Sequence, residues 1–246
     1  MLNLNLVKYF YIDLDDTLLM TAKASALGLE RAYHKLASEC DEDLSVRLPM
    51  EAFMREMDKA YQENRHSEFE IGDFEGFCRK IPSPYSLSPK HTGDSLAARL
   101  FWNYKETKNK ALMPFEGAFD LIAGLKKSEG VVFCITRGVC NYQFTKLMLS
   151  DLEDKFSAVL VVDMRKEGDS KAKQLKEHLD LNKIRPERAA IIGDSTEDID
   201  AGQAAGIRTI RIRTERHKDD QSEKPADGEF ASILELKRHL ETRVLI

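Results

Sequence analysis

The sequence predicts an α/β protein whose doubly wound parallel sheet is interrupted by an inserted all-helical domain. Three observations support this expectation. The apolar run at residues 9–12 has the character of a buried strand, and residues 19–110 show helical periodicity without a strand signal. Beyond this stretch, strand-like and helix-like segments alternate, which is typical of a parallel sheet covered by helices. We therefore expect a Rossmann-like core at residues 1–17 and 111–246 and a helical domain at residues 18–110.

The first predicted strand ends in a cluster of acids. Large apolar residues are followed by Asp13, Asp15 and Asp16, which cannot continue into a core, so the strand must deliver them to its carboxyl end. Open α/β sheets bind their ligands at that edge. Because neighbouring carboxylates repel one another, the cluster predicts a compensating cation, here a hard divalent metal. The alternative is that Asp-Asp-Thr only caps the helix that follows.

The spacing of these acids suits catalysis. Asp13 and Asp15 are separated by a single residue, so in an extended chain both side chains project to one side. One carboxylate can then attack a substrate while the other handles a proton. Thr17 begins the exit loop and can offer a hydroxyl or a backbone donor.

The inserted domain is predicted from apolar residues spaced by three and four. These stripes predict a first helix near residues 26–40 and a second at residues 49–61, whose methionines and aromatics suit a hydrophobic core. Prolines and a glycine predict a loop at residues 81–94, followed by a third helix near residues 95–104.

The rest of the chain alternates between the two periodicities. The predicted strands are residues 131–136, 158–163, 189–193 and 209–212. The predicted helices are residues 117–128, 141–149, 170–181, 196–205 and 232–243. The polar stretch at residues 215–229 is expected to be an exposed loop.

A second polar strand end follows the strand at residues 131–136. Thr136 would stand at the carboxyl edge beside the acids, where its hydroxyl can bond a phosphoryl oxygen, and Gly138 allows close backbone approach. The alternative is an ordinary turn from strand to capped helix.

A third strand end follows residues 189–193. Asp194 leaves the sheet as Asp13 does, and Asp198 lies one helical turn further on, so both can face a shared cation. The alternative is that Ser195 caps the helix and the acids answer its dipole, and both descriptions can hold together.

A lysine between these strands could supply positive charge. Lys171 opens the helix that follows Gly168, where it could reach a phosphate or hold a nucleophilic carboxylate ionised. Lys166 and Lys173 are close by and compete for this role, and a lysine at a helix start is usually solvated surface.

In this order, the segments resemble the haloacid dehalogenase-like hydrolase superfamily. Its pattern is a strand ending Asp-x-Asp-x-Thr, a strand ending in Thr or Ser, a helix-borne Lys or Arg, and a strand ending Gly-Asp with a further Asp one turn later. Here these positions are Asp13, Asp15 and Thr17, Thr136, Lys171, and Gly193 with Asp194 and Asp198. The resemblance covers the predicted α/β core, and many relatives carry a helical cap between the first two motifs.

The resemblance implies a role for each motif. Asp13 would be the nucleophile that forms an aspartyl-phosphate, and Asp15 would be the acid to the leaving group and then the base to water. Mg²⁺ would bind Asp13, the Asp15 carbonyl, Asp194 and Asp198, the last directly or through water. Thr17, Thr136 and Lys171 would hold the phosphate.

The second motif departs from the pattern at Arg137, where many relatives have Asn. This arginine either binds an anionic group of the substrate or points to solvent. The helix of Lys171 also lacks the Lys-Pro seen in many capped members.

The resemblance implies a Mg²⁺-dependent phosphatase of a small phosphorylated metabolite, closed over by the helical cap. A haloacid dehalogenase is less favoured because dehalogenase relatives generally lack an acid at the position of Asp15. A phosphomutase of the β-phosphoglucomutase kind stays open, since it would pass the same phosphoryl group to a sugar hydroxyl.

Two non-enzymatic classes fit the sequence less well. A phosphoacceptor receiver domain would not contain the long helical insertion. The cluster Arg208, Arg211, Arg213, Arg216 and Lys218 could bind nucleic acid, but its alternation with apolar residues favours an edge strand with charged gatekeepers.

Composition limits the remaining possibilities. A formal net charge of -5 argues against a general nucleic-acid binder. The sequence contains neither a membrane-span pattern nor a signal-peptide pattern, and its four cysteines show no CxxC spacing, so we expect a cytoplasmic protein with free thiols. The sequence does not distinguish a monomer from a homodimer.

Overall fold

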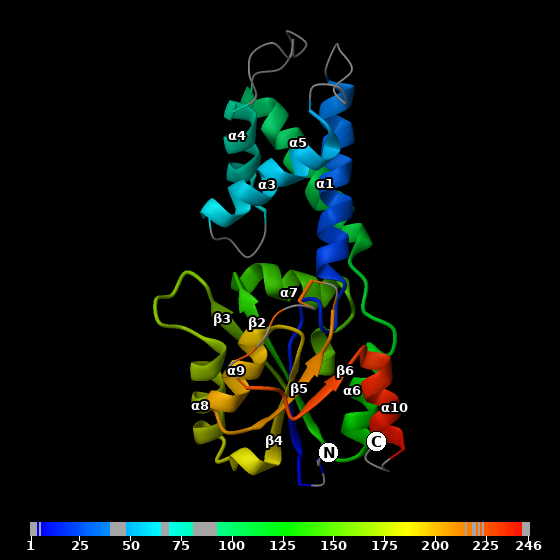
Figure 1. Cartoon of the computed structure of the whole chain (residues 1–246), viewed down its shortest axis with the longest axis vertical. Helices are drawn as coiled ribbons and strands as arrows, with labels where there is room; N and C mark the ends of the chain where they lie inside the picture. The colour runs from blue at the N-terminus through cyan, green and yellow to red at the C-terminus, as the bar shows by residue number, and fades with distance from the viewer. Residues whose placement is uncertain are drawn as a thin grey trace. The chain divides into compact units, whose positions relative to one another are not determined.

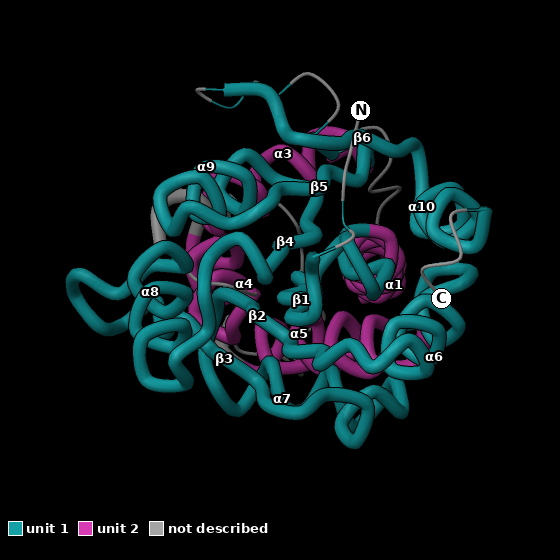
Figure 2. Tube along the Cα trace, turned by 90° about the horizontal axis from the view of Figure 1, so that it is seen from below, with its two compact units in different colours: residues 1–22, 113–246 teal, residues 23–112 magenta. Residues whose placement is uncertain are grey.

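The computed structural model of the 246-residue chain divides into two compact units. Unit 1 comprises Met1–Ala22 and Met113–Ile246, and unit 2 comprises Lys23–Leu112 (Figure 2). The structure describes residues 4, 6–39, 48–64, 69–80, 93–214, 216–217, 220, 222 and 224–242.

Unit 1 is built on a six-stranded sheet in which every strand pair is parallel, with strand order β3-β2-β1-β4-β5-β6 (Figure 1). The strands are β1 (Tyr9–Ile12), β2 (Val131–Gly138), β3 (Ala158–Asp163), β4 (Ala189–Gly193), β5 (Arg208–Ile212) and β6 (Gly228–Phe230). The predicted doubly wound fold class is therefore confirmed.

The strand β1 lies at the centre of the sheet. Ile12 pairs with Cys134 of β2 and with Ile192 of β4. Both faces of a central parallel strand are buried, which explains why Phe10 and Tyr11 belong to an unbroken apolar run. Strands β2 and β3 lie on one side of β1, and β4, β5 and β6 lie on the other. The strand order therefore reverses at β1, and open α/β sheets bind their ligands at such a switch point.

Helices cover both faces of this sheet. Figure 2 shows α8 and α9 on one side and α6 and α7 on the other, and α10 packs against α6. Their bounds are α6 (Ala118–Lys127), α7 (Cys140–Leu149), α8 (Lys171–Leu181), α9 (Thr196–Ala204) and α10 (Ile233–Glu241). Short 3₁₀ turns lie at Glu153–Lys155 and Pro186–Arg188.

Two details of the core differ from the predictions. The strand β2 continues beyond Thr136 because Arg137 and Gly138 still pair with β3. The end of the predicted loop at residues 215–229 instead forms β6, which pairs with β5. A three-residue strand with glycine and an exposed glutamate carries no recognisable period, so sequence pattern could not reveal it. Consequently β5 is not an edge strand.

The described secondary structure of unit 2 is helical. Its helices are α1 (Thr21–Ser38), α3 (Met50–Asn64), α4 (Ile71–Lys80) and α5 (Gly93–Ala111), with the first two residues of α1 belonging to unit 1. Helix α4 was not predicted, and most of the predicted loop at residues 81–94 lies outside the described residues.

The core of unit 2 contains Phe53, Met57 and Phe74 from the predicted apolar stripes and from α4. Gly28 allows α1 and α5 to approach, because a Cβ there would lie 2.7 Å from the Tyr104 ring.

No described helix is both long and apolar enough to cross a membrane. The described cysteines Cys78, Cys134 and Cys140 are free thiols, and Cys40 lies outside the described residues.

Candidate active site

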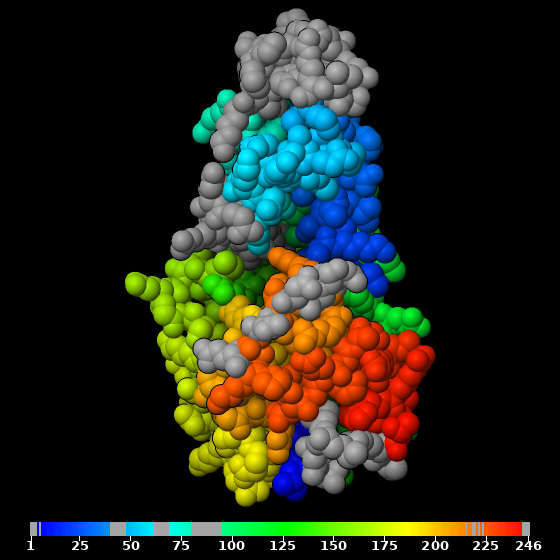
Figure 3. Space-filling model, in the orientation of Figure 1, coloured from blue at the N-terminus to red at the C-terminus, as the bar shows by residue number. Residues whose placement is uncertain are grey.

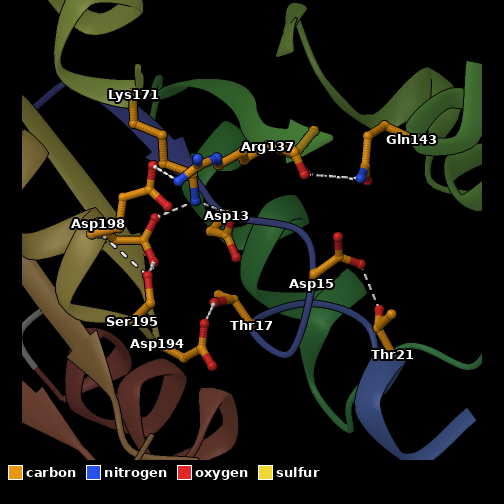
Figure 4. A network of polar contacts seen from close by, with 12 residues as sticks. Asp13, Asp15, Thr17, Thr21, Arg137, Gln143, Lys171, Asp194, Ser195 and Asp198 are labelled. Carbon is orange, nitrogen blue, oxygen red and sulfur yellow. Dashed lines mark hydrogen bonds and ion pairs between the residues drawn. The ribbon is translucent and has the colours of Figure 1, made fainter. Parts of the chain in front are cut away.

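The candidate site lies at the carboxyl edge of β1, β2 and β4 (Figure 4). Asp13 directly follows β1, and its backbone N–H donates to the carbonyl of Ile192 on β4 at 2.9 Å. Thr136 lies within β2, and Asp194 directly follows β4. Parallel pairing of adjacent strands thus brings three segments that are far apart in sequence to one edge of the sheet.

Lys171 links two of these carboxylates. Its Nζ donates to Asp13 Oδ1 at 2.6 Å and to Asp198 Oδ1 at 2.5 Å, and all of these side chains are buried. Figure 4 shows them turned toward one another. The competing lysines do not share this position, since Lys166 is exposed and Lys173 is 43% exposed beside Glu177.

A capping box at the start of α9 holds Asp198. Its Oδ2 accepts from the Ser195 backbone N–H at 3.1 Å and from the Ser195 hydroxyl at 2.6 Å, while Ser195 in turn caps α9. Asp198 therefore belongs both to the capping box of α9 and to the carboxylate cluster of the site.

Gly193 is required for this approach of Asp198 to β4. A Cβ at position 193 would lie 2.3 Å from Asp198 Cγ, closer than any real contact. The glycine at the end of β4 is thus explained by the space that the Asp198 side chain occupies.

The second acid of this strand end, Asp194, receives hydroxyl donors on both oxygens. Thr17 donates to Oδ1 at 3.3 Å, and Thr214 donates to Oδ2 at 3.0 Å. Burial raises the pKa of Asp194 to about 6, with the nearby charge of Asp198 adding to the effect. Thr17, predicted to bind phosphate, is therefore fully buried against a carboxylate.

Among the described residues, Asp13, Asp194 and Asp198 form a potential metal site. Each offers an oxygen, and these oxygens lie within 4.8 Å of one another. Burial raises the pKa of Asp13, and Asp198 and Asp194 raise it further against the opposing effect of Lys171. Although burial alone lowers the pKa of Lys171, Asp13 and Asp198 raise it, so its ammonium stays charged. One ammonium against three carboxylates leaves excess negative charge, which fits an oxygen-preferring divalent cation.

The Asp15 carboxylate lies outside this cluster. Both of its oxygens accept from Lys146 Nζ, at 2.9 and 2.8 Å, and Oδ1 also accepts from the Thr21 hydroxyl at 2.6 Å. Figure 4 shows this carboxylate turned toward Thr21, apart from Asp194 and Asp198. The expected Asp15 metal contact, through its backbone carbonyl, stays a prediction.

Lys146 was not among the site residues predicted from the sequence. A signal was present, because Gln143 and Lys146 of the predicted helix and Ser150, which directly follows it, are spaced by three and four residues and form a polar stripe. All three are buried.

Thr136 is fully buried and bonded within the protein. Its hydroxyl donates to Gln143 Oε1 at 3.2 Å, and Gln143 Nε2 donates to the Arg137 carbonyl at 3.0 Å. The predicted contact of Arg137 with an anionic substrate group stays a prediction. The Arg137 guanidinium is half-exposed and donates to Glu197 on α9 at 3.0 Å.

The segment after β5 supplies further contacts that sequence analysis missed. Asp16, with a left-handed backbone at φ 58°, accepts from the Ala22 backbone N–H at 2.8 Å and pairs with Arg216 at 3.0 Å. His217 Nε2 lies 3.9 Å from Asp194 Oδ2. Figure 3 shows the C-terminal part of the chain, in orange and red, at the surface of unit 1.

The described arginines of the predicted basic cluster are bonded to acids or backbone carbonyls, and Lys218 lies outside the described residues. Arg211 is 1% exposed, and Arg208 and Arg213 pair with Asp227 and Glu229 at 2.9 and 2.7 Å. The expectation of edge gatekeepers was wrong for Arg211, because β6 covers β5 and the guanidinium turns inward to backbone carbonyls.

A buried carboxylate paired with a lysine, beside a potential metal cluster, lies at the switch point of a parallel α/β sheet, where enzymes of this fold class bind their ligands. Residues 11–212 match the family described as haloacid dehalogenase-like hydrolase. The chain belongs to this family, as the motif order predicted.

Relatives of known name agree with this assignment. The chain is 26% identical to glyceraldehyde 3-phosphate phosphatase of Pyrococcus furiosus over 83% of its own length and 80% of that protein. A shorter match, 29% identical, relates 40% of the chain to 45% of pyrophosphatase PpaX of Bacillus cereus.

Solved structures share the fold. The magnesium-bound putative HAD-hydrolase YfnB of Bacillus subtilis aligns over 95% of this chain and 98% of its own, with 20% identity and a TM-score of 0.63. A putative β-phosphoglucomutase of Thermotoga maritima aligns over 96% of this chain and 99% of its own, with 14% identity and a TM-score of 0.66.

Proposed function

We propose that the protein is a Mg²⁺-dependent phosphatase that removes phosphate from a small phosphorylated metabolite through an aspartyl-phosphate on Asp13. The observation that carries this proposal is the bridge of Lys171 between Asp13 and Asp198, beside Asp194. It combines a nucleophile with the charge needed to offset a phosphoryl group. The names of the curated relatives support the phosphatase class.

In the first step, a carboxylate oxygen of Asp13 attacks phosphorus, the new O–P bond forms, and the ester P–O bond breaks. Asp15 gives a proton to the departing alkoxide. In the second step, water attacks the phosphoryl group, the Asp13–phosphorus bond breaks, and Asp15 takes the proton from the water. Inorganic phosphate and free Asp13 result.

Bound between Asp13, Asp194 and Asp198, Mg²⁺ would act as a Lewis acid on the phosphoryl oxygens. Lys171, whose ammonium is already within hydrogen-bonding distance of Asp13, would neutralise further negative charge on the phosphoryl oxygens. Thr136 would have to turn its hydroxyl proton from Gln143 toward the phosphate to donate to it. A phosphate role for Thr17 would likewise require it to leave Asp194, and Arg137 could reach an anionic substrate group by leaving Glu197.

Unit 2 is proposed to serve as the substrate-specificity cap. The cytoplasmic location expected from the sequence stays a prediction, and the sequence favours neither a monomer nor a homodimer.

A phosphomutase would use the same first step but pass the phosphoryl group to a sugar hydroxyl.

The proposal is tested by phosphate release from a panel that includes phosphorylated aldehydes, sugar phosphates and pyrophosphate, with and without Mg²⁺. We expect Mg²⁺-dependent release, and Asp13→Asn should reduce it by more than about 1000-fold, since the nucleophile is lost. Asp120→Asn is the matched control, because Asp120 is 68% exposed on α6.

Phosphorus NMR of the products distinguishes the two activities. Inorganic phosphate indicates a phosphatase, whereas a sugar phosphate with the group on another hydroxyl indicates a mutase. Equal release by wild type and Asp13→Asn would refute the aspartyl-phosphate mechanism.

A further inference from the structure

We propose that Lys146 is a positioning residue that holds Asp15 in place for its proton transfers, and that Gln143 couples this pair to Thr136. This inference deepens the proposed function and rests on it. It assigns a role to Lys146, a buried lysine that lies outside the four motifs of the family.

The Asp15 carboxylate has few orientations left to it. Lys146 Nζ lies 2.9 and 2.8 Å from its two oxygens, and the Thr21 hydroxyl lies 2.6 Å from Oδ1. Two donor groups that make three contacts restrict both torsions of a short side chain, so Asp15 is held at one angle to the site. Proton transfer depends steeply on such geometry.

Burying the Lys146 ammonium group lowers the stability of the folded protein, so its position calls for a functional explanation. The Lys146 side chain is only 4% exposed and that of Asp15 is 25% exposed. The free energy needed to transfer an ammonium group from water to a buried position is larger than the stabilisation that most single ion pairs provide. An apolar residue at this inward position of α7 would pack against the sheet without that cost. The lysine is therefore better explained by the carboxylate that it orients than by stability.

Gln143 extends the contact toward the phosphate side of the site. The Arg137 carbonyl can only accept a hydrogen bond, so the Gln143 amide nitrogen must face it, and Oε1 must face Thr136 and Lys146. Lys146 Nζ lies 3.4 Å from this Oε1, a weaker contact than that with Asp15. A hydrogen-bonded path thus runs from Thr136 through Gln143 and Lys146 to Asp15.

Each acid of the first motif then has its own lysine. Asp13 is bonded by Lys171 from α8, and Asp15 is bonded by Lys146 from α7, on the opposite face of the sheet. This separation matches the two proposed roles, because the nucleophile needs charge beside the phosphoryl group whereas the proton carrier needs a fixed angle.

The test uses Lys146→Met with p-nitrophenyl phosphate and Mg²⁺. Nitrophenolate leaves without taking a proton, so phosphorylation of Asp13 is largely spared, whereas attack by water still needs Asp15. We expect a rapid burst of nitrophenolate close to one per enzyme, followed by turnover about 100-fold slower than wild type. The phosphoenzyme should accumulate in the same variant.

The other variants show whether Lys146 acts through Asp15. Lys171→Met should abolish the burst itself, and Lys173→Met should behave as wild type because Lys173 is a surface residue. Asp15→Asn/Lys146→Met should be no slower than Asp15→Asn alone, since the lysine then has nothing to orient. The double variant also removes the whole buried ion pair, so it serves if the single variant does not fold.

Several outcomes would overturn the inference. The first is a turnover rate of Lys146→Met equal to that of wild type, and the second is slow turnover by Lys146→Met without a burst of nitrophenolate. The third is a double variant whose loss of turnover rate equals the combined losses of Asp15→Asn and Lys146→Met. Wild type without Mg²⁺-dependent release would instead remove the proposed function, and the inference with it.

Discussion

At the scale of single residues, the site depends on close approaches that leave no spare volume. Gly193 is the sharpest case, because the carboxyl group of Asp198 occupies the space that a side chain there would need. Asp198 in turn is held by Ser195 and Lys171, so displacing it disturbs the Asp13 environment as well. A residue with no functional group therefore sets the positions of those that have one.

Gly193→Ala should reduce Mg²⁺-dependent phosphate release by about 100-fold, because a shift of roughly 1 Å in reacting groups has that effect. Gly76→Ala in α4 is the control, since a Cβ there meets nothing within 4 Å. Steady-state kinetics of both variants, with circular dichroism to check folding, measures the difference. Equal activity of both would contradict the steric argument.

At the scale of elements, β5 supports the site through a buried arginine. Arg211 donates to the carbonyl of Asp194 at 3.2 Å and to those of His217 and Asp220 at 2.9 and 2.8 Å. It thereby ties the segment after β5 to the end of β4. Thr214 on that segment donates to Asp194, so the strand's inward arginine helps to place a residue of the metal cluster.

Arg211→Met should lower the free energy of unfolding by roughly 2–4 kcal/mol, because buried carbonyls lose charged donors. Arg213→Met on the same strand should cost at most about 1 kcal/mol, since its pair with Glu229 is partly exposed. Urea unfolding of the two variants makes the comparison. Similar losses for both would show that the buried contacts contribute no more than the surface pair.

At the scale of the whole molecule, the excess negative charge of the site links metal binding to stability and pH. Burial and neighbouring acids raise the pKa of Asp194 from 3.8 to about 6 and raise that of Asp13 as well. An acid with a raised pKa in the folded state favours folding at low pH, and this contribution is lost as pH rises through about 6. A divalent cation can replace the lost protons.

We expect the rise in melting temperature on adding Mg²⁺ to be larger at pH 7.5 than at pH 5, because the cation competes with protons for these carboxylates. Without Mg²⁺, the Asp194 contribution makes the protein less stable as pH rises through about 6. Differential scanning fluorimetry of wild type and Asp194→Asn tests both effects. An increment that is equal or larger at pH 5 would contradict the proposed metal cluster.

Much of the fold and part of the site could be predicted because the signals are local. The apolar run of β1, the alternation of the core and the helical stripes of unit 2 reflect burial of neighbouring residues in a regular element. The strand ends at Asp13, Thr136 and Asp194 follow from the same patterns, since parallel strands share a carboxyl edge.

Residue order and periodicity were sufficient to predict the fold class and to place Asp13, Asp194 and Asp198 at one edge of the sheet. The partners of the charged side chains became visible only in the folded chain: Lys171 rather than Lys173 lies beside Asp13, Lys146 lies beside Asp15, and Arg211 turns inward. β6 became a strand only through its pairing with β5. These outcomes depend on contacts between segments that are distant in sequence, and no local pattern records the direction of a long charged side chain.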